Sequence, residues 1–341
     1  MTRRKISLFV LGGLFVLLTL LAADVLLVIF AGLLFGVLLS GGGGLIARFT
    51  GLGRGWSIGA FILLVLLAFG GAFTAFAPAA AEQFDELARQ LPEAFSSLRD
   101  RIATFSWGDQ LLSRLAPSRL LSGEGGGMAA TAFTSTFGAL GNAVIILFIG
   151  LYGAIDPGLY RGGLRALLAP SLRPRADEVM DEVGSTLASW LGAQLISMTV
   201  VGMLTWLGLW LIGIPLAFIL GLIAALLAFV PNIGPVLAAA RALLLAVPDG
   251  MHAVGLVVAV YLLVQTVESY LVTPMIQQER VSLPPALIIS SQLLFGVLFG
   301  LMGLALATPL AALGLTLFRE VYVKDYLERE SDSATAMIGM R

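Results

Sequence analysis

Charged residues divide this chain into apolar stretches that match the thickness of a membrane. The first two stretches, residues 6–23 and 25–47, flank Asp24, and two others cover residues 56–78 and 131–155. A helix needs about 20 apolar residues to cross the hydrocarbon core of a bilayer. We therefore predict an all-α, polytopic membrane protein whose first two helices form a hairpin. Asp24 is expected at the turn of that hairpin, and an intramembrane carboxylate is the alternative.

The longest apolar run exceeds a single crossing. No residue from Val183 to Ala240 carries a formal charge, and a helix of that length would measure about 87 Å against a hydrocarbon core of roughly 30 Å. Proline and glycine are the residues that interrupt helices. The strongest break signals in the run are Pro231, Asn232, Gly234 and Pro235, with an earlier one at Pro215. Irregular backbone at membrane depth needs protein or a water-filled cavity around it. We interpret this break as lining a transport site, and a turn at the membrane surface is the alternative.

A second apolar run, residues 281–318, is also too long for one crossing. It opens with Pro284 and Pro285 and is interrupted by Gly296, Gly300 and Gly303, and the span before it ends at Pro274. Two interrupted regions in one chain are typical of secondary transporters with broken helices. The pattern leaves open whether each region is a re-entrant hairpin or a pair of short spans.

Two regions carry most of the charge outside the apolar runs. Between residues 79 and 127, apolar positions recur every three or four residues among charged ones, which predicts an amphipathic helical insert outside the membrane. It could cap a pore, pack against other subunits, or be a solvated linker domain. A dense arginine group is formed by Arg161, Arg165, Arg173 and Arg175, and it predicts a cytoplasmic loop. We expect the carboxylates that follow, Asp177, Glu178, Asp181 and Glu182, to favour the dipole of the next helix, and a metal site is the alternative.

These features give a domain organisation with both termini in the cytoplasm. The predicted parts are N-terminal transmembrane helices (1–78), the external insert (79–127), a span with its charged loop (128–182), a transport core with broken helices (183–320) and a cytoplasmic tail (321–341).

Composition narrows the function classes. Hydrophobic residues make up 58% and charged residues 12% of the chain, whereas soluble domains carry about 25% charged residues. The chain has no cysteine and one histidine, His252, which excludes disulfides, thiolate catalysis and metal sites rich in cysteine or histidine. No basic patch indicates nucleic-acid binding, and no nucleophile–base pair indicates an enzyme. We expect no cofactor.

Glu268 is the sharpest candidate for chemistry within the membrane. It shares one helix face with Tyr261 and Gln265. A charge at the bilayer centre costs at least about 2.5–3.5 kcal/mol, so such residues are treated as functional. We expect Glu268 to bind a proton or cation. The alternative places it near the headgroups, because Pro274 follows closely.

Other polar residues in the apolar runs are weaker candidates. Arg241 could pair with Glu268, bind an anionic or polyhydroxylated solute, or extend to the membrane interface. Asn232, Gln194 and Gln292 could face a polar solute, although hydrogen bonds between helices are the more common role of such groups. Gln194 shares a helix face with Ser197.

The C-terminal half resembles the autoinducer-2 exporter (AI-2E) family, which includes PerM-type permeases. The resemblance rests on ordered motifs: Phe229-Val-Pro-Asn-Ile-Gly-Pro235, Tyr261-Leu-Leu-Val-Gln-Thr-Val-Glu268, Pro274, Ser282-Leu-Pro-Pro285, Gln292-Leu-Leu-Phe-Gly296, Gly300-Leu-Met-Gly303 and Ala307-Thr-Pro309. It implies a bacterial inner-membrane protein of about eight segments, forming a homo-oligomer for which a pentamer is one option. By motif match, the resemblance implies that the family's functional positions correspond here to Pro231, Asn232, Gly234, Pro235, Gln265, Glu268, Pro274, Gly296, Gly300 and Pro309. Arg241 departs from the family pattern, in which a proline is common.

The resemblance also implies the function class. Family members are linked to export of autoinducer-2 or to exchange of Na⁺ or Li⁺ for protons. We therefore expect a transporter of a small polar solute, coupled to protons or cations through Glu268. The alternatives are a Na⁺(Li⁺)/H⁺ antiporter, an oligomeric channel and a membrane scaffold. Pro215, Pro274, Pro285, Gly296, Gly300 and Pro309 are expected to break or gate helices.

Overall fold

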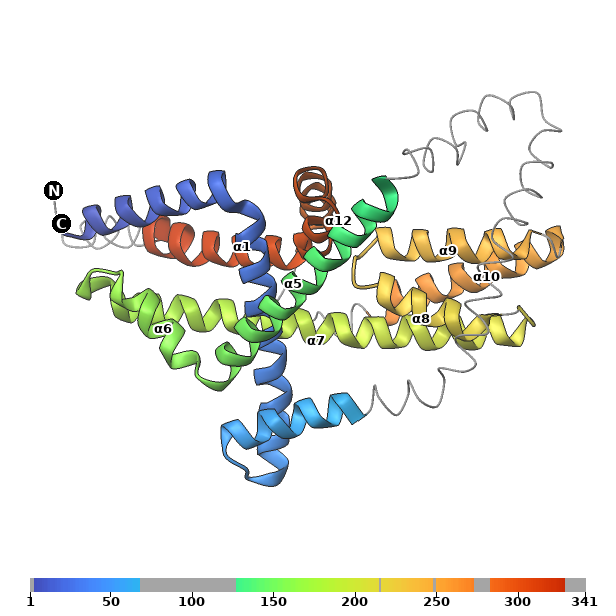
Figure 1. The fold of residues 1–341 in the computed structure, drawn as a ribbon, viewed down its shortest axis with the longest axis horizontal. Coiled ribbons are helices and arrows are strands. Elements are labelled where there is room, and N and C mark those ends of the chain that lie inside the picture. Colours follow the sequence, from blue (N-terminus) through green and yellow to red (C-terminus); the bar gives the residue numbers. More distant parts are fainter. Residues whose placement is uncertain (1–2, 68–126, 215, 248–249, 273–282, 329–341) are drawn as a thin grey trace, which may run out of the picture. The chain divides into compact units, whose positions relative to one another are not determined.

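Helices form the part of the chain that the structure describes. The computed structural model describes residues 3–67, 127–214, 216–247, 250–272 and 283–328, and no strand occurs in these ranges. The chain divides into two compact units (Figure 1). Unit 1 contains residues 1–65, 142–192 and 277–341, and unit 2 contains residues 66–141 and 193–276. The predicted external insert, residues 79–127, lies outside the described residues except for its last residue.

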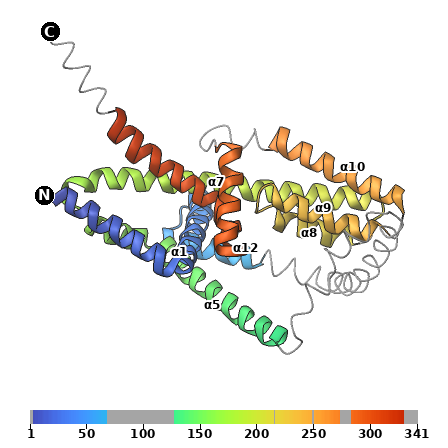
Figure 2. The same cartoon turned by 90° about the horizontal axis from the view of Figure 1, so that it is seen from above.

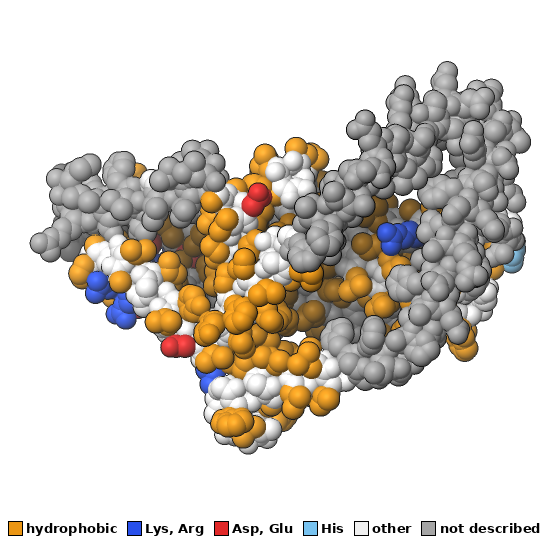
Figure 3. Space-filling view, in the orientation of Figure 1, with side chains coloured by type: hydrophobic (Ala, Val, Ile, Leu, Met, Phe, Trp, Pro, Cys, Tyr) orange, Lys and Arg blue, Asp and Glu red, His pale blue; other side chains and the backbone are white. Residues whose placement is uncertain are grey.

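Several helices have the length and composition of membrane spans. Four described helices meet both conditions, and up to five do if a bent pair counts as one span. Large apolar side chains such as Leu301 and Leu211 are 80% and 76% exposed, and Figure 3 shows hydrophobic side chains spread over the visible surface of the described helices. Such a surface suits lipid rather than water. The prediction of an all-α, multi-pass membrane protein is confirmed, while the count of eight segments stays a prediction.

In unit 1, the N-terminal helix is bent rather than folded into a hairpin with a loop. Helix α1 (Arg3–Thr50) contains one residue with non-helical angles, Ala22, with φ −148° and ψ 42°. The helix changes direction there (Figure 1). Asp24 lies two residues later in helical structure and is exposed. The predicted break is therefore present, but Asp24 itself is not in a turn.

Glycines allow the helices of unit 1 to pack closely. A β-carbon at Gly43 of α1 would lie 2.7 Å from Ile58, which belongs to the next helix, residues 54–67. Helix α5 (Gly127–Ile155) meets α1 where Gly150 lies beside the carbonyl oxygen of Gly32. Small residues let backbones approach in this way within membranes. The glycines at residues 41–44 thus include part of a packing surface, and α1 continues past them to Thr50.

Ion pairs join two charged helices of unit 1. Helix α5 bends by 91° into α6 (Pro157–Ala166), and a short turn, η1 (Pro170–Leu172), leads to α7 (Arg173–Leu211). Arg161 pairs with Asp181, and Arg165 with Asp177 at 3.6 Å. Because α7 already begins at Arg173, these carboxylates lie beyond its first turn. Their role is pairing with arginines, not the helix dipole that the sequence predicted.

The last long helix of unit 1 contains the second predicted break. Helix α12 (Pro285–Leu317) has a non-helical residue at Gly300, with φ 61° and ψ −143°. A β-carbon at Gly303 would lie 2.2 Å from the Phe295 carbonyl oxygen, so the chain turns sharply at this point (Figure 2). The π-helix η3 (Phe318–Glu328) continues α12. In it, the buried Glu320 accepts hydrogen bonds from Arg175 at 2.9 Å and from Lys324.

Unit 2 packs four helical segments around one apolar core. The C-terminal part of α7 contacts α8 (Ala217–Leu227), which is followed by α9 (Ile233–Ala246) and α10 (Met251–Val267). A short π-turn, η2 (Glu268–Val272), continues α10. The core includes Leu209, Leu220, Ala242 and Val257, each at most 1% exposed. This core fixes the positions of the polar residues described next.

Candidate functional site

The predicted break between Phe229 and Pro235 is the connection of a helical hairpin. Helices α8 and α9 contact each other along the hairpin, and α9 also contacts α10 (Figures 1 and 2). Helices of 11 and 14 residues measure about 16 and 21 Å, which is less than the roughly 30 Å hydrocarbon core. The sequence prediction of a broken region is confirmed here.

Two residues determine the shape of the break. Asn232 has φ 66° and ψ −48° and precedes the first residue of α9, although its side chain does not cap that helix. Gly234 is buried, and a β-carbon there would lie 1.8 Å from the Leu227 carbonyl oxygen. Its amide also donates to the Val230 carbonyl at 2.9 Å. Only glycine fits where the end of α8 and the start of α9 approach this closely.

Gln194 of α7 holds the end of α8. Its Nε2 donates to the Ala228 carbonyl oxygen at 2.6 Å, and the side chain is only 9% exposed. The last carbonyls of a helix have no partner within the helix. Gln194 therefore satisfies a backbone group that the break leaves open. Gln194 thus makes a hydrogen bond between two helices, which was predicted from the sequence as the alternative to facing a polar solute.

Glu268 lies where α10 changes into the π-turn, and neutral donors surround its carboxylate. Ser197 Oγ of α7 donates to Glu268 Oε1 at 2.6 Å, and Gln265 Nε2 donates to Oε2 at 3.2 Å. Glu268 and Ser197 are half-buried. π-Helical turns inside α-helices occur frequently at functional sites. The sequence placed Gln265 and Glu268 on one helix face, and the structure adds the hydrogen bond between them. Ser197 had been predicted only to share a face with Gln194.

A groove of about 230 Å³ lies beside this carboxylate. The described residues that line it come from α9 and α10: Pro235, Val236, Ala239, Leu243, Val258, Tyr261, Leu262 and Gln265. These residues are apolar apart from Tyr261, whose hydroxyl donates to the Ala238 carbonyl at 3.2 Å, and Gln265. Gln265 thus belongs to both the groove and the hydrogen-bonded set around Glu268.

Arg241 and Asn232 are not part of that set. Arg241 lies on α9 and Asn232 just before it, and both side chains are exposed. None of the ion pairs in the described ranges includes Arg241, and Glu268 binds Ser197 and Gln265 instead. Neither residue is among the described residues that line the groove. Pairing of Arg241 with Glu268, one of three predicted roles, does not occur here. His252 is exposed near the start of α10.

The remaining predicted residues belong to unit 1 or lie outside the described ranges. Helix α12 carries Pro285 at its first residue, the buried Gln292 and Pro309, and Gly296 and Gly300 around its break. Pro215 and Pro274 are not among the described residues. The candidate site of unit 2 therefore consists of the hairpin break, the groove, and Ser197, Gln265 and Glu268.

Known proteins similar to this chain have names that refer to transport. One relative is YrrI of Bacillus subtilis, which is named as a transport protein. It is 29% identical over 170 residues, which cover 50% of this chain and 48% of YrrI. The chain thus spans about half the length of that relative. PerM of Escherichia coli, named as a permease, is 25% identical over 306 residues, or 86% of this chain and 76% of PerM. TqsA of Escherichia coli, named as an AI-2 transport protein, is 25% identical over 239 residues, or 66% of this chain and 67% of TqsA.

The family comparison covers the apolar runs and both helix breaks. Residues 6–322 match the family described as AI-2E family transporter, which is nearly the whole chain. The motifs that carried the resemblance in the sequence lie within this range and form the two breaks and the Glu268 region. This chain is a multi-pass membrane protein that belongs to the AI-2E transporter family.

Proposed function

We propose that this protein moves a small polar solute across a bacterial inner membrane through unit 2, with Glu268 binding the proton or cation that drives the movement. The observation that carries the proposal is the contact of the Glu268 carboxylate with Ser197 and Gln265, beside a broken hairpin. An autoinducer-2-like molecule is the first candidate solute, because the related TqsA is named as an AI-2 transport protein.

The environment of Glu268 suits a site that gains and loses a cation. Its carboxylate receives hydrogen bonds from two neutral groups, and none of the ion pairs in the described ranges includes it. Because these partners are neutral, no cation of the described residues occupies the carboxylate, and an incoming proton or cation meets no fixed competitor there.

Gln265 connects the groove with the Glu268 carboxylate. Its amide donates to Glu268, and its side chain lines the groove between α9 and α10. A polar solute in the groove would compete for that amide and for the Tyr261 hydroxyl. Binding of the solute would therefore change the hydrogen bonds that Glu268 receives. A volume of about 230 Å³ is below the range of drug-sized ligand sites, which suits a small solute.

Exchange of Na⁺ or Li⁺ for protons is the second candidate function. Hard cations prefer oxygen ligands such as carboxylates, and the Ser197 hydroxyl oxygen lies 2.6 Å from Glu268 Oε1. These two residues could supply the first ligands of an alkali cation. In that function, the same carboxylate would bind protons and the metal cation alternately.

The wider organisation is part of the proposal. Both termini are proposed to lie in the cytoplasm, and the broken hairpin to be re-entrant because its helices are short. We also propose a homo-oligomer, which the resemblance to the AI-2E family implies. Family membership makes a transporter, not an enzyme, the natural interpretation.

A flux experiment tests the proposal. The full-length protein is reconstituted in vesicles, and movement of autoinducer-2 and of Na⁺ is measured with and without a pH gradient. We expect the wild-type protein to move one of the two, and Glu268→Gln to abolish the dependence of flux on the pH gradient, because an amide neither ionises nor carries a negative charge. Thr266→Val is the matched control, because among the described residues its hydroxyl donates to the Leu262 carbonyl of its own helix alone, at 2.7 Å.

The outcomes separate the two functions. Flux of autoinducer-2 alone supports export, and flux of Na⁺ coupled to protons supports exchange. Gradient-driven flux that survives in Glu268→Gln would contradict the role of Glu268 in either function. Vesicles that move neither probe would contradict transport of these substrates.

A further inference from the structure

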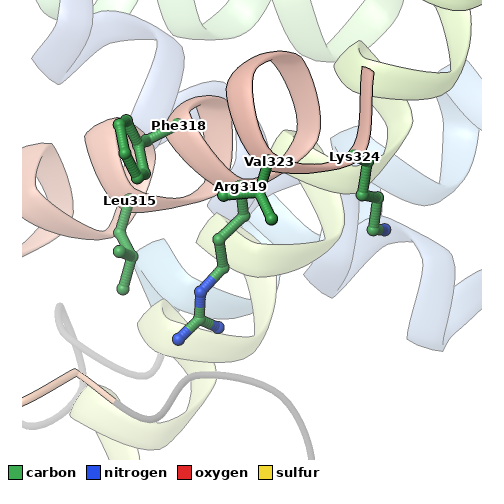
Figure 4. Close-up of a pocket in the computed structure, with 5 residues that line it drawn as sticks. All are labelled: Leu315, Phe318, Arg319, Val323 and Lys324. Carbon is green, nitrogen blue, oxygen red and sulfur yellow. The ribbon is translucent and has the colours of Figure 1, made fainter. Parts of the chain in front are cut away.

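The C-terminal end of the last apolar helix carries a cavity with both apolar and cationic walls. The cavity has a volume of about 400 Å³, and its described lining residues are Leu315, Phe318, Arg319, Val323 and Lys324 (Figure 4). All five come from the end of α12 and the beginning of η3. Nothing in the proposed transport function uses these residues.

The π-helix explains why these side chains share one face. In a π-helix the backbone hydrogen bonds join residues i and i+5, so residues four and five apart lie on neighbouring turns. Val323 and Lys324 are four and five residues after Arg319 and follow it on the same face. Figure 4 shows the Arg319 and Lys324 side chains extending to the same side of the helix.

The two cations of the cavity differ in their partners. Lys324 donates to Glu320, which also accepts from Arg175, so that one carboxylate receives two cations. None of the ion pairs in the described ranges includes Arg319. Arg319 is exposed, and its planar guanidinium can bind two phosphate oxygens at once. The cavity therefore has an anion-binding group available above an apolar wall.

Aromatic rings place this helix end at a membrane interface. Phe318 stacks on Tyr322 with ring centroids 5.1 Å apart, and Tyr322 stacks on Tyr326 at 5.7 Å. All three rings are about half-exposed, between 46% and 58%. Aromatic residues with one polar end are enriched at the level of lipid headgroups. The charge-free run ends at Phe318, and charged residues begin with Arg319. The three rings therefore lie at the change from apolar to charged sequence.

We infer that this cavity binds an anionic phospholipid of the surrounding bilayer. The phosphate contacts Arg319 and Lys324, and the first carbons of an acyl chain contact Leu315, Phe318 and Val323. Charge complementarity selects an acidic lipid over a zwitterionic one. The apolar wall distinguishes this occupant from a free phosphate ion, which would gain nothing from it.

Native mass spectrometry of the full-length protein tests the inference. The protein in detergent is titrated with phosphatidylglycerol or phosphatidylcholine, and the apparent Kd of the first bound lipid is measured. We expect tighter binding of phosphatidylglycerol, and we expect Arg319→Gln to weaken it about fivefold while leaving phosphatidylcholine unchanged. Arg319→Lys keeps the charge and should restore most of the preference.

A matched control separates this cavity from general attraction of lipid to cations. Arg48 is an exposed arginine in the last turn of α1 and does not line the cavity, so Arg48→Gln should leave the affinity for phosphatidylglycerol unchanged. An equal loss in Arg48→Gln and Arg319→Gln would contradict a specific site. Equal affinity for both lipids, or displacement of phosphatidylglycerol by millimolar inorganic phosphate, would also overturn the inference. Arg319 makes no ion pair in the described ranges, so its replacement is not expected to unfold the protein.

Discussion

The two helix breaks of this protein use a similar backbone arrangement but differ in what supports it. In the first break Asn232 has a positive φ and Gly234 follows it, under the carbonyl of Leu227. In the second, Gly300 has a positive φ and Gly303 follows it, under the carbonyl of Phe295. Each break thus combines a residue of positive φ with a glycine, whose lack of a side chain leaves room for a carbonyl of the preceding helical segment.

The supporting residues make the first break more strongly determined. Pro231 and Pro235 restrict the backbone on both sides of Asn232, and Gln194 binds the carbonyl at the end of α8. Around Gly300 the nearest proline within α12 is Pro309, nine residues away. The first break therefore rests on prolines and a side-chain hydrogen bond as well as on Asn232 and Gly234, whereas the second rests chiefly on Gly300 and Gly303. This difference predicts how each break responds to substitution.

The largest effect is expected at Gly234. A β-carbon there would lie 1.8 Å from a backbone oxygen, so Gly234→Ala forces α8 and α9 apart and should cost about 3 kcal/mol or more of unfolding free energy. Thermal unfolding of the purified protein in detergent measures it. Gly255→Ala in α10 is the control, because no atom lies within 4 Å of that added carbon. An unchanged unfolding temperature for Gly234→Ala would mean that the close approach at the break is not maintained.

A smaller effect is expected at Gly300, for a different reason. No atom lies within 4 Å of a β-carbon there, so Gly300→Ala adds no clash and acts only through φ 61° and ψ −143°. Those angles are almost restricted to glycine, and the cost should be about 1–3 kcal/mol. Gly314→Ala in the same helix also meets no atom but should stabilise by up to about 1 kcal/mol, since alanine favours helix. Thermal unfolding should thus change in opposite directions for the two variants, and shifts of the same sign would contradict the special conformation of Gly300.

The sequence predicted those features whose physical cause is local. Prolines and glycines within runs too long for one crossing indicated both breaks, and a charge in an apolar helix indicated Glu268. The Ser197 contact with Glu268 could not be predicted, because the two residues are 71 positions apart and only tertiary packing joins them. The same holds for Arg175 and Glu320, which are separated by 145 residues. The bend at Ala22 lacks a proline or glycine, and the sequence indicated it only through the charge of its neighbour Asp24.

The smallest of the three effects is expected at Gln194, and it tests whether the first break needs its supporting side chain. Gln194→Leu keeps the volume but removes the donor that binds the Ala228 carbonyl at 2.6 Å. Loss of one such hydrogen bond should cost about 1 kcal/mol, because the prolines and Gly234 still hold the break. Thr199→Val on the same helix is the control, since that hydroxyl binds only the Leu195 carbonyl of α7 at 2.8 Å, and it should change stability by less. Hydrogen exchange of the amides at residues 233 and 234 should rise in Gln194→Leu and not in Thr199→Val. If exchange there is the same in both variants, Gln194 does not hold the end of α8, and the first break depends on its backbone alone, as the second one does.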